Sequence, residues 1–222
     1  MNSLRQKLSA SPLLLRVAPF AIFVALTFLQ GKFGEESRYW IYFFKTIVGA
    51  WMIWLIWPLV QEMRWKISWE AVLIGLAVFA IWVGLDDFYP KIFKPAPAWN
   101  PQTQFLENPM LAWFFTVVRI VGSSLVVPPI EEVFYRSFLY RYIGQSDFQS
   151  IPLNHFNWRA LAAVSIFFGF AHREWLVGIL CGLAFQWLVI RKNRLGDAMT
   201  AHAITNFLLA VWVVWRGAWK FW

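Results

Sequence analysis

Long apolar stretches separated by short polar connections set the pattern of this chain. A helix needs about 20 mostly apolar residues to cross a membrane. Stretches of this kind predict membrane helices at 12–30, 39–60, 69–86, 110–129, 159–173, 174–190 and 196–215. The pattern therefore predicts an all-α fold, a polytopic transmembrane helical bundle.

Two consecutive prolines interrupt the fourth apolar stretch at Pro128 and Pro129. Proline is tolerated in the first turn of a helix but not in its interior, because it lacks the backbone N–H and its ring clashes with the preceding turn. We therefore expect the pair to break the span 110–129 and to begin a second helix that ends near Ile143. The bundle then has seven membrane helices, or eight if this segment crosses the bilayer by itself.

The composition agrees with a membrane protein. Of the 222 residues, 59% are hydrophobic and only 14% are charged, whereas a soluble domain carries about 25% charged residues. The 16 Trp and 22 Phe are more than a soluble surface could hide, and many are expected as anchors at the membrane boundary. The single Cys181 excludes an intrachain disulfide, and a small buried side chain is expected there.

The net charge is +8, and short basic groups lie near Arg5–Arg16, at Arg64 and Lys66, and at 191–194. Lys and Arg concentrate in the cytoplasmic connections of membrane proteins. Placing all three groups in the cytoplasm is consistent with seven crossings, an inner N-terminus and an outer C-terminus. The groups are too short for a nucleic-acid surface, so the expected contact is the lipid bilayer. No small-residue cleavage site follows the apolar run 17–29, which is therefore expected to be a retained first span.

Ionisable residues within membrane helices are costly and mark functional sites. The strongest group is Glu131, Glu132 and Arg136. Residues four apart share one face of a helix, so Glu132 can pair with Arg136 and leave Glu131 free as a general base. The alternative is a charged cluster at the membrane interface, where Glu is favoured near a helix start.

Two further polar groups lie in apolar helices. His172 follows Phe168 at the end of one stretch, and His202 and Asn206 share one face of the last helix. Each has a structural alternative, because a His can cap a helix C-terminus and polar side chains can join membrane helices by hydrogen bonds. Taken together, a Glu, two His and an Asn suffice to activate a water molecule and to stabilise an oxyanion.

Three short patterns in this order resemble the signature motifs of the CPBP family. They are Glu131-Glu132-x-x-x-Arg136, Phe168-x-x-x-His172 and His202-x-x-x-Asn206. The family includes the type II CAAX prenyl endopeptidases and bacteriocin-processing and immunity-related membrane proteases. By its length the chain also resembles the small CAAX-protease-related proteins associated with exosortase systems.

The resemblance implies an intramembrane endopeptidase acting on a membrane-embedded or lipid-modified protein. It implies that Glu131 and His172 activate water, and that His202 and Asn206 form the oxyanion hole. Glu132 is included in the catalytic set, with Arg136 and Phe168 as supporting residues. We expect one transmembrane domain over residues 1–222, with N-terminal spans in 12–86 and a catalytic core in 110–215, located in the bacterial cytoplasmic (inner) membrane.

The metal requirement is open at the level of sequence. Glu131, His172 and His202 are three candidate zinc ligands that would leave one position for water. However, His-Glu-x-x-His is absent and no Cys lies near the motifs in sequence. The resemblance favours a metal-free glutamate mechanism, so no cofactor is expected and zinc is the alternative.

Two other functions compete with a protease. One is a non-enzymatic immunity or assembly partner of another membrane protein. The other is a small transporter with a buried carboxylate–histidine proton relay. The serine and aspartate chemistries of other intramembrane proteases fit less well, because 122–125 reads Gly-Ser-Ser-Leu and 196–197 supplies only a Gly-Asp fragment.

Two observations constrain the fold. Arg119 lies in the middle of a predicted span and needs a partner, which we expect to be a carboxylate in the bundle. Helices that begin level at 110, 159 and 196 would place Glu131, His172 and His202 at depths that differ by roughly 10–20 Å. Their convergence requires a tilt, a shifted helix start or a helix broken at the prolines.

Overall fold

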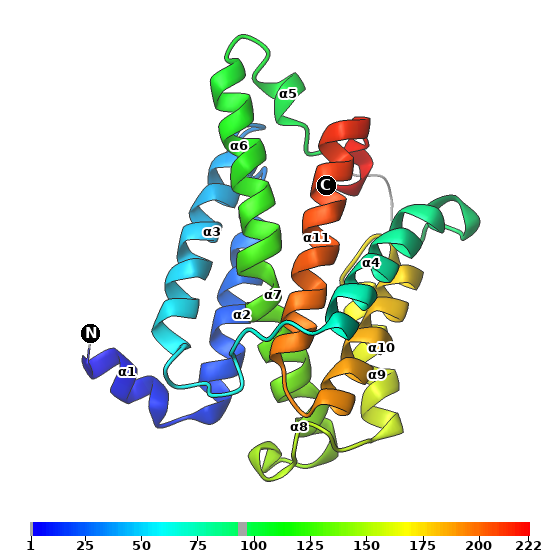
Figure 1. Ribbon diagram of the computed structural model, residues 1–222. Helices are drawn as coiled ribbons and strands as arrows, with labels where there is room; N and C mark the ends of the chain where they lie inside the picture. Colours follow the sequence, from blue (N-terminus) through cyan, green and yellow to red (C-terminus); the bar gives the residue numbers. More distant parts are fainter. Residues whose placement is uncertain (1, 93–96) are drawn as a thin grey trace.

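The computed structural model describes residues 2–92 and 97–222, which form a bundle of helices (Figure 1). Five helices are long and apolar enough to cross a membrane: α2 (Pro12–Leu29), α3 (Ser37–Ile56), a continuous helix over Pro109–Gly144, α10 (Trp175–Lys192) and α11 (Gly196–Arg216). Two apolar helices are shorter, α4 (Trp69–Gly84) and α9 (Trp158–Phe170). No β-strand occurs in the described residues. The predicted polytopic helical bundle is confirmed.

Short elements complete the described part of the chain. They are α1 (Asn2–Ser9), α5 (Pro101–Gln104) and three 3-10 turns at Asp86–Phe88, Phe148–Ser150 and Trp219–Phe221. Side-chain oxygens of Ser or Asn accept first-turn N–H groups at the starts of five helices, at Ser11, Ser68, Asn100, Asn108 and Asn157. These caps satisfy N–H groups that have no partner within the helix, and so they fix where the helices begin.

The predicted break at Pro128 and Pro129 is wrong. The helix continues as α6 (Pro109–Val121), a π-helical turn (Gly122–Val126), α7 (Val127–Glu132), a second π-helical turn (Val133–Leu139) and α8 (Tyr140–Gly144). In the first π turn the Val127 N–H bonds to the Gly122 carbonyl, five residues back. The same spacing would pair residue 128 with the Ser123 carbonyl, but proline has no N–H. The Asn206 Nδ2 donates to that carbonyl instead, at 2.8 Å.

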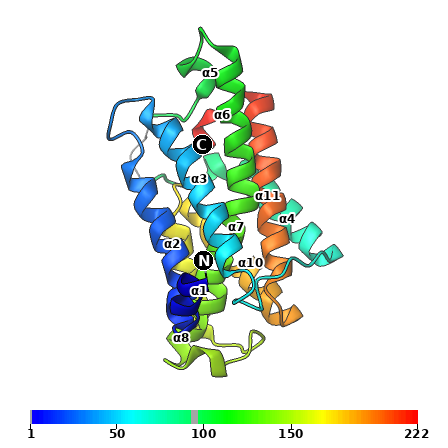
Figure 2. The same cartoon turned by 90° about the vertical axis from the view of Figure 1, so that its left-hand side faces the viewer.

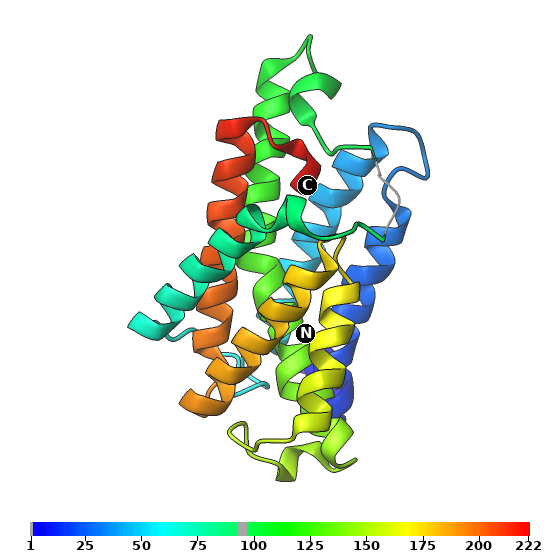
Figure 3. The same cartoon turned by 90° about the vertical axis from the view of Figure 1, so that its right-hand side faces the viewer.

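The seven apolar helices of the described residues alternate in direction through the bundle (Figures 1 and 3). The hairpin of α9 and α10 does not reach the upper end, and its turn lies at mid-height. Its two helices pack very closely, because a Cβ on Gly178 would lie 2.9 Å from the Gly169 Cα. A Cβ on Gly182 would lie 2.9 Å from the Ser165 Cα. The close crossing of a short hairpin therefore holds the turn 171–174 inside the bundle.

The connections that carry the basic groups gather at one end of the bundle. Helix α1, the connection 57–68 and the turn between α10 and α11 all lie in the lower half of Figures 1 and 2. This arrangement agrees with the expectation that the three basic groups share one side of the membrane. The assignment of that side to the cytoplasm stays a prediction.

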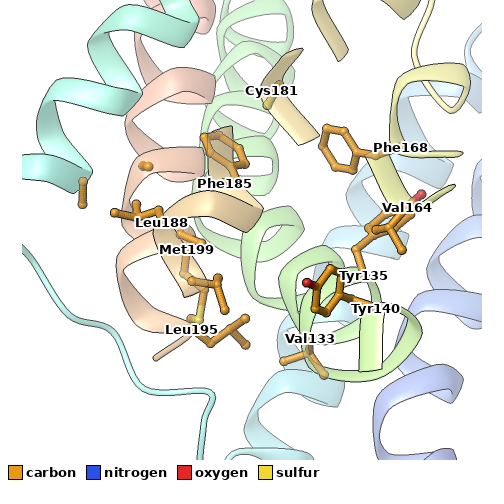
Figure 4. Packing of buried hydrophobic residues seen from close by; sticks show 14 of the residues in the cluster. Val133, Tyr135, Tyr140, Val164, Phe168, Cys181, Phe185, Leu188, Leu195 and Met199 are labelled. Carbon is orange, nitrogen blue, oxygen red and sulfur yellow. The ribbon is translucent and has the colours of Figure 1, made fainter. Parts of the chain in front are cut away.

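The largest hydrophobic core lies between α4, α9, α10, α11 and the second π turn. Figure 4 shows part of this core, which includes Val133, Tyr135, Val164, Phe168, Cys181, Phe185, Leu188 and Met199. A second cluster joins α3 and α6 to the segment before α5 through Tyr39, Tyr42, Trp99 and Phe115. The outer faces expose large apolar side chains such as Trp51, Trp113 and Phe207, as expected for surfaces that contact lipid.

Four donors converge on Glu62, in the connection between α3 and α4. Its Oε1 accepts from the Arg16 Nη2 at 2.5 Å, the Ser137 Oγ at 2.6 Å and the Arg141 Nη2 at 3.0 Å, and from the Arg16 Nε at 3.1 Å. Burial alone would raise the pKa of Glu62, but the Arg16 guanidinium and the hydrogen bonds from Ser137 and Arg16 outweigh it and lower this pKa. One carboxylate thus joins α2 and the end of the long helix to the connection 57–68.

Glu62→Gln is expected to destabilise the protein by about 2 kcal/mol, because hydrogen bonds to a charged group are lost. Since the folded pKa of Glu62 is lowered, its contribution is present above the ordinary value of 4.5 and is lost as the pH falls below it. The melting temperature in detergent should therefore drop with acid more steeply for the wild type than for the variant. Parallel pH curves for the two proteins would contradict this expectation.

Candidate active site

Glu132, Arg136 and His202 form a buried charged cluster between the long helix and α11. The Glu132 Oε1 accepts from the His202 Nδ1 at 2.9 Å, and its Oε2 lies 3.3 Å from the Arg136 Nε. Glu132 and Arg136 are fully buried, and His202 is 4% exposed. The predicted Glu132–Arg136 ion pair is present, although its angles do not make a hydrogen bond. The carboxylate holds the imidazole in place and leaves the His202 Nε2 to face away from it.

Glu131 lies on the other side of the same turn and lines a cavity that Glu132 does not reach. The Glu131 Oε2 is 3.9 Å from the His202 Nε2, and its side chain is 17% exposed. No hydrogen-bond partner of this oxygen occurs among the described residues. Adjacent positions on a helix point about 100° apart, so one carboxylate braces the cluster and the other faces the cavity.

His172 lies in the turn between α9 and α10 and lines the same cavity. Its Nδ1 is 2.7 Å from the Phe168 carbonyl, which can only accept. The proton is therefore assigned to Nδ1, and Nε2 is left as a base. This hydrogen bond also caps the C-terminal end of α9, which is the structural role that the sequence offered as the alternative for His172. His172 therefore caps α9 and lines the cavity at the same time.

Asn206 lines the cavity one turn after His202 on α11. Its amide donates one hydrogen to the Ser123 carbonyl at 2.8 Å. An amide nitrogen carries two hydrogens, so the second remains to donate. This hydrogen bond joins α11 to the long helix, as the structural alternative for Asn206 expects. It still leaves one N–H of the Asn206 amide free to donate into the cavity.

Phe168 lies at the centre of these groups. Its ring centroid is 4.4 Å from the Arg136 Cζ, 4.7 Å from the His172 ring and 6.0 Å from the His202 ring. The cation above its face lies within the range of a cation–π contact. Phe168 therefore separates the buried Arg136 from the cavity and packs against both imidazoles.

The structure brings all of the predicted site residues to one place. The depth difference between Glu131, His172 and His202 is removed because the α9–α10 hairpin is short and the long helix passes through the proline pair. Glu131, His172, His202, Asn206 and Phe168 line the cavity, whereas Glu132 and Arg136 lie behind it. The cavity measures about 730 Å³, which is within the usual range for ligand pockets, about 300–1,000 Å³.

Two cations, Lys45 and Arg119, also line this cavity and were not assigned to the site from sequence. The Lys45 Nζ lies 4.7 Å and the Arg119 Cζ 4.9 Å from the centroid of the Tyr42 ring. The Arg119 Cζ also lies 4.5 Å from the Trp99 centroid. The expectation that Arg119 pairs with a carboxylate is wrong, because no carboxylate of the described residues lies within 4 Å of it. Aromatic rings surround it instead.

The aromatic contacts offset only part of the free-energy cost of placing the charges of Lys45 and Arg119 in an apolar environment. A charged side chain at the centre of a bilayer costs about 2.5–3.5 kcal/mol on insertion scales. A cation–π contact returns about 0.5–2 kcal/mol. Lys45 adds one hydrogen bond to the Thr27 Oγ1 at 2.9 Å, and Arg119 has no acceptor for its guanidinium among the described residues. Neither cation has a carboxylate of the described residues within ion-pair distance, and the nearest compensation for Lys45 by an acid is the longer-range attraction of Glu131 on the same cavity.

The candidate zinc ligands do not converge on one point. No group of three or more His, Cys, Asp or Glu side chains in the described residues is arranged to hold a metal ion. The expectation that no Cys lies near the motifs is wrong, because Cys181 follows His172 by nine residues and lines the same cavity; its side chain is buried, as expected. The residues as arranged do not fit zinc, and we derive no catalytic step through it.

The comparisons with known proteins agree with the motifs. The family described as type II CAAX prenyl endopeptidase Rce1-like matches residues 112–208, a little under half of the chain. Curated proteins and solved structures gave no match, and the exosortase-associated placement stays a prediction. The matched segment contains every motif residue from Glu131 to Asn206, so the part of the chain that carries the site is similar to the Rce1-like type II CAAX prenyl endopeptidases.

Proposed function

We propose that the protein is a metal-free intramembrane endopeptidase of a lipid-modified or membrane-embedded protein in a bacterial cytoplasmic membrane. The observation that carries the proposal is the meeting of Glu131, His172, His202 and Asn206 on one cavity inside a helical bundle. The family match supports protease activity. The residue roles, the substrate and the absence of a metal requirement are the proposed part.

Glu131 and His172 activate the attacking water in this mechanism. Among the described residues no group donates a hydrogen bond to the Glu131 Oε2, and His172 presents an unprotonated Nε2, so each can accept a proton. The water oxygen bonds to the peptide carbonyl carbon as its proton passes to Glu131. The same carboxyl then returns the proton to the amide nitrogen as the C–N bond breaks.

His202 and Asn206 stabilise the oxyanion, and Glu132 acts as a positioning residue. Asn206 donates its second amide hydrogen. Since the His202 Nδ1 donates to Glu132, donation from Nε2 requires a second proton on the ring. With both carboxylates ionised and Arg136 charged, the cluster has one net negative charge, which that proton neutralises. Donors held in place before the reaction are the usual source of oxyanion stabilisation.

The test is cleavage of S-farnesylated peptides by the purified protein in detergent, followed by mass spectrometry. We expect one peptide bond to be cut, at the same rate with and without 1,10-phenanthroline. Inhibition by the chelator that added Zn²⁺ reverses would contradict the metal-free mechanism. Intact peptides throughout a panel of farnesylated and unmodified substrates would instead favour the non-enzymatic membrane partner.

A further inference from the structure

Residues 217–222 follow α11 and fold back against the bundle, and we call this segment the strap (Figure 3). Helix α11 ends at Gly217, whose φ of +62° is a left-handed conformation that glycine adopts without strain. The 3-10 turn Trp219–Phe221 follows, and the side chains of Phe221 and Trp222 line the candidate active-site cavity. A segment outside the residues that the family matches therefore supplies part of the cavity wall.

The strap lies at the end of the bundle that the α9–α10 hairpin does not reach. Figure 3 shows the strap and the connection after α4 above the turn of this hairpin. The turn carries His172, which lines the same cavity. The strap is therefore the part of the cavity wall that faces this end of the bundle.

Side-chain contacts hold the strap against its neighbours. The Lys220 Nζ lies 2.5 Å from the Asp86 Oδ2, just after the end of α4. The Trp222 ring packs against Trp99, with the two centroids 5.8 Å apart. In the described part of the chain, no backbone hydrogen bond joins residues 219–222 to another element. The strap can therefore separate from the bundle without breaking a backbone ladder.

The ion pair of the strap is built to open at a small cost. The side chain of Lys220 is 58% exposed, whereas that of Asp86 is 6% exposed. Asp86 also pairs with Lys91, so its buried charge stays compensated when Lys220 moves away. Ion pairs with an exposed member contribute little to stability and are screened by salt. Opening of the strap thus leaves no buried charge without a partner.

We propose that the strap is a gate of the cavity, which turns about Gly217 to admit the peptide segment of the substrate. In the closed state Lys220 is the latch on Asp86, and Phe221 and Trp222 complete the cavity wall. Segments that close over an active site exclude water during the reaction and open for exchange. The admission of substrate rests on the proposed peptidase function, whereas the opening itself does not.

Cys181 supplies a probe of the gate that does not depend on catalysis. It is the single cysteine of the sequence, lines the same cavity and is 2% exposed. N-ethylmaleimide has to enter the cavity to modify it. The rate of modification is measured by mass spectrometry on the purified protein in neutral detergent. If opening and closing are fast compared with the reaction, this rate follows the population of the open state.

Lys220→Met is expected to speed the modification of Cys181 about two- to fivefold, which is the effect of losing one exposed ion pair. Raising NaCl from about 50 to about 500 mM should speed the reaction in the wild type and not in the variant, because salt screens the latch. Lys220→Arg keeps the charge and should keep the wild-type rate. Equal rates in the wild type and Lys220→Met overturn the gate.

Two controls separate opening of the strap from other changes. Lys32→Met removes an exposed cation that does not line the cavity and should leave the rate of Cys181 modification unchanged. Glu62→Gln weakens the bundle near its other end and, well below the melting temperature, should also leave this rate unchanged. Acceleration by either control that equals the effect of Lys220→Met overturns the gate, because general loosening then exposes the cysteine.

A reversible cross-link connects the gate to cleavage. Asp87 is exposed, and its Oδ1 lies 3.5 Å from the Lys220 Nζ. The Asp87→Cys/Lys220→Cys pair is therefore joined by a bis-methanethiosulfonate reagent in a Cys181→Ala background. The joined protein should lose most of its cleavage of the S-farnesylated peptide, and dithiothreitol should restore the rate of the same protein before joining.

The two readouts fail independently. Undiminished cleavage by the joined protein overturns the gate and leaves the peptidase standing. Modification of Cys181 that follows the latch, in a protein that cuts no peptide, refutes the peptidase and leaves a gated cavity.

Discussion

Replacing Glu131 with glutamine is expected to lower kcat for peptide cleavage by about 10²–10⁴-fold, because a general base contributes this much. Glutamine has nearly the same shape but cannot take a proton from water. His172→Ala should have a similar effect, since it removes the second base on the cavity. The measurement is the rate of product formation at saturating peptide, with size-exclusion elution and melting temperature as evidence that each variant is folded.

Glu174→Gln supplies the control for this experiment. Glu174 lines the same cavity but has no contact with His172 or His202 within ion-pair distance. Its replacement should leave kcat close to the wild-type value. Activity retained in both Glu131→Gln and His172→Ala would reject the proposed water activation, and an equal loss in Glu174→Gln would show that the assay reports the charge of the cavity as a whole.

The membrane helices were predictable because their signal is local. Five of the helices in the described residues are long and apolar enough to span a bilayer, and two more, α4 and α9, are apolar but shorter. Ser or Asn caps mark several helix starts, so the expected and observed bounds are close. The continuation of the long helix through Pro128 and Pro129 was not predictable by local rules. It depends on a π turn and on the Asn206 amide, which donates a hydrogen bond to the Ser123 carbonyl. These two residues are 83 positions apart in sequence.

The candidate site was predictable in its members and only partly in its arrangement. The four-residue spacings placed Glu132 beside Arg136 and His202 beside Asn206, since they depend only on helical geometry. The position of His172 depends on the short α9–α10 hairpin and its glycine contacts. Lys45 lies before the motif region, and nothing in its local sequence indicates that α3 borders the cavity.

Arg119 shows a different limit of sequence reasoning. Its place within an apolar span indicated correctly that it needs a compensating group, and a carboxylate was the natural expectation. Its actual neighbours are Tyr42, Trp99 and Trp222, which come from three distant parts of the chain. Aromatic residues are so common in this sequence that no pattern singles out these three.

Glu132→Met is expected to destabilise the protein by about 3–5 kcal/mol, because it leaves the buried Arg136 charge without a partner. Arg136 is fully buried, and none of its three guanidinium nitrogens has a hydrogen-bond acceptor among the described residues. The carboxylate at 3.3 Å from its Nε is thus the main compensation. Unfolding in a denaturing detergent series should show a midpoint below the wild-type value for this variant. The midpoint of Arg136→Met should also lie below the wild-type value.

The double variant Glu132→Met/Arg136→Met separates stability from catalysis. Replacing both members of a buried ion pair with apolar residues is often neutral for stability, so the midpoint should return towards the wild-type value. The His202 Nδ1 then has no carboxylate to orient it, and kcat should stay about 10²–10⁴-fold low, as when an orienting carboxylate is lost from a catalytic histidine. A double variant that regains both stability and activity would contradict the positioning role of Glu132. Recovery of stability alone would identify Glu132 as the residue that aims His202 at the cavity.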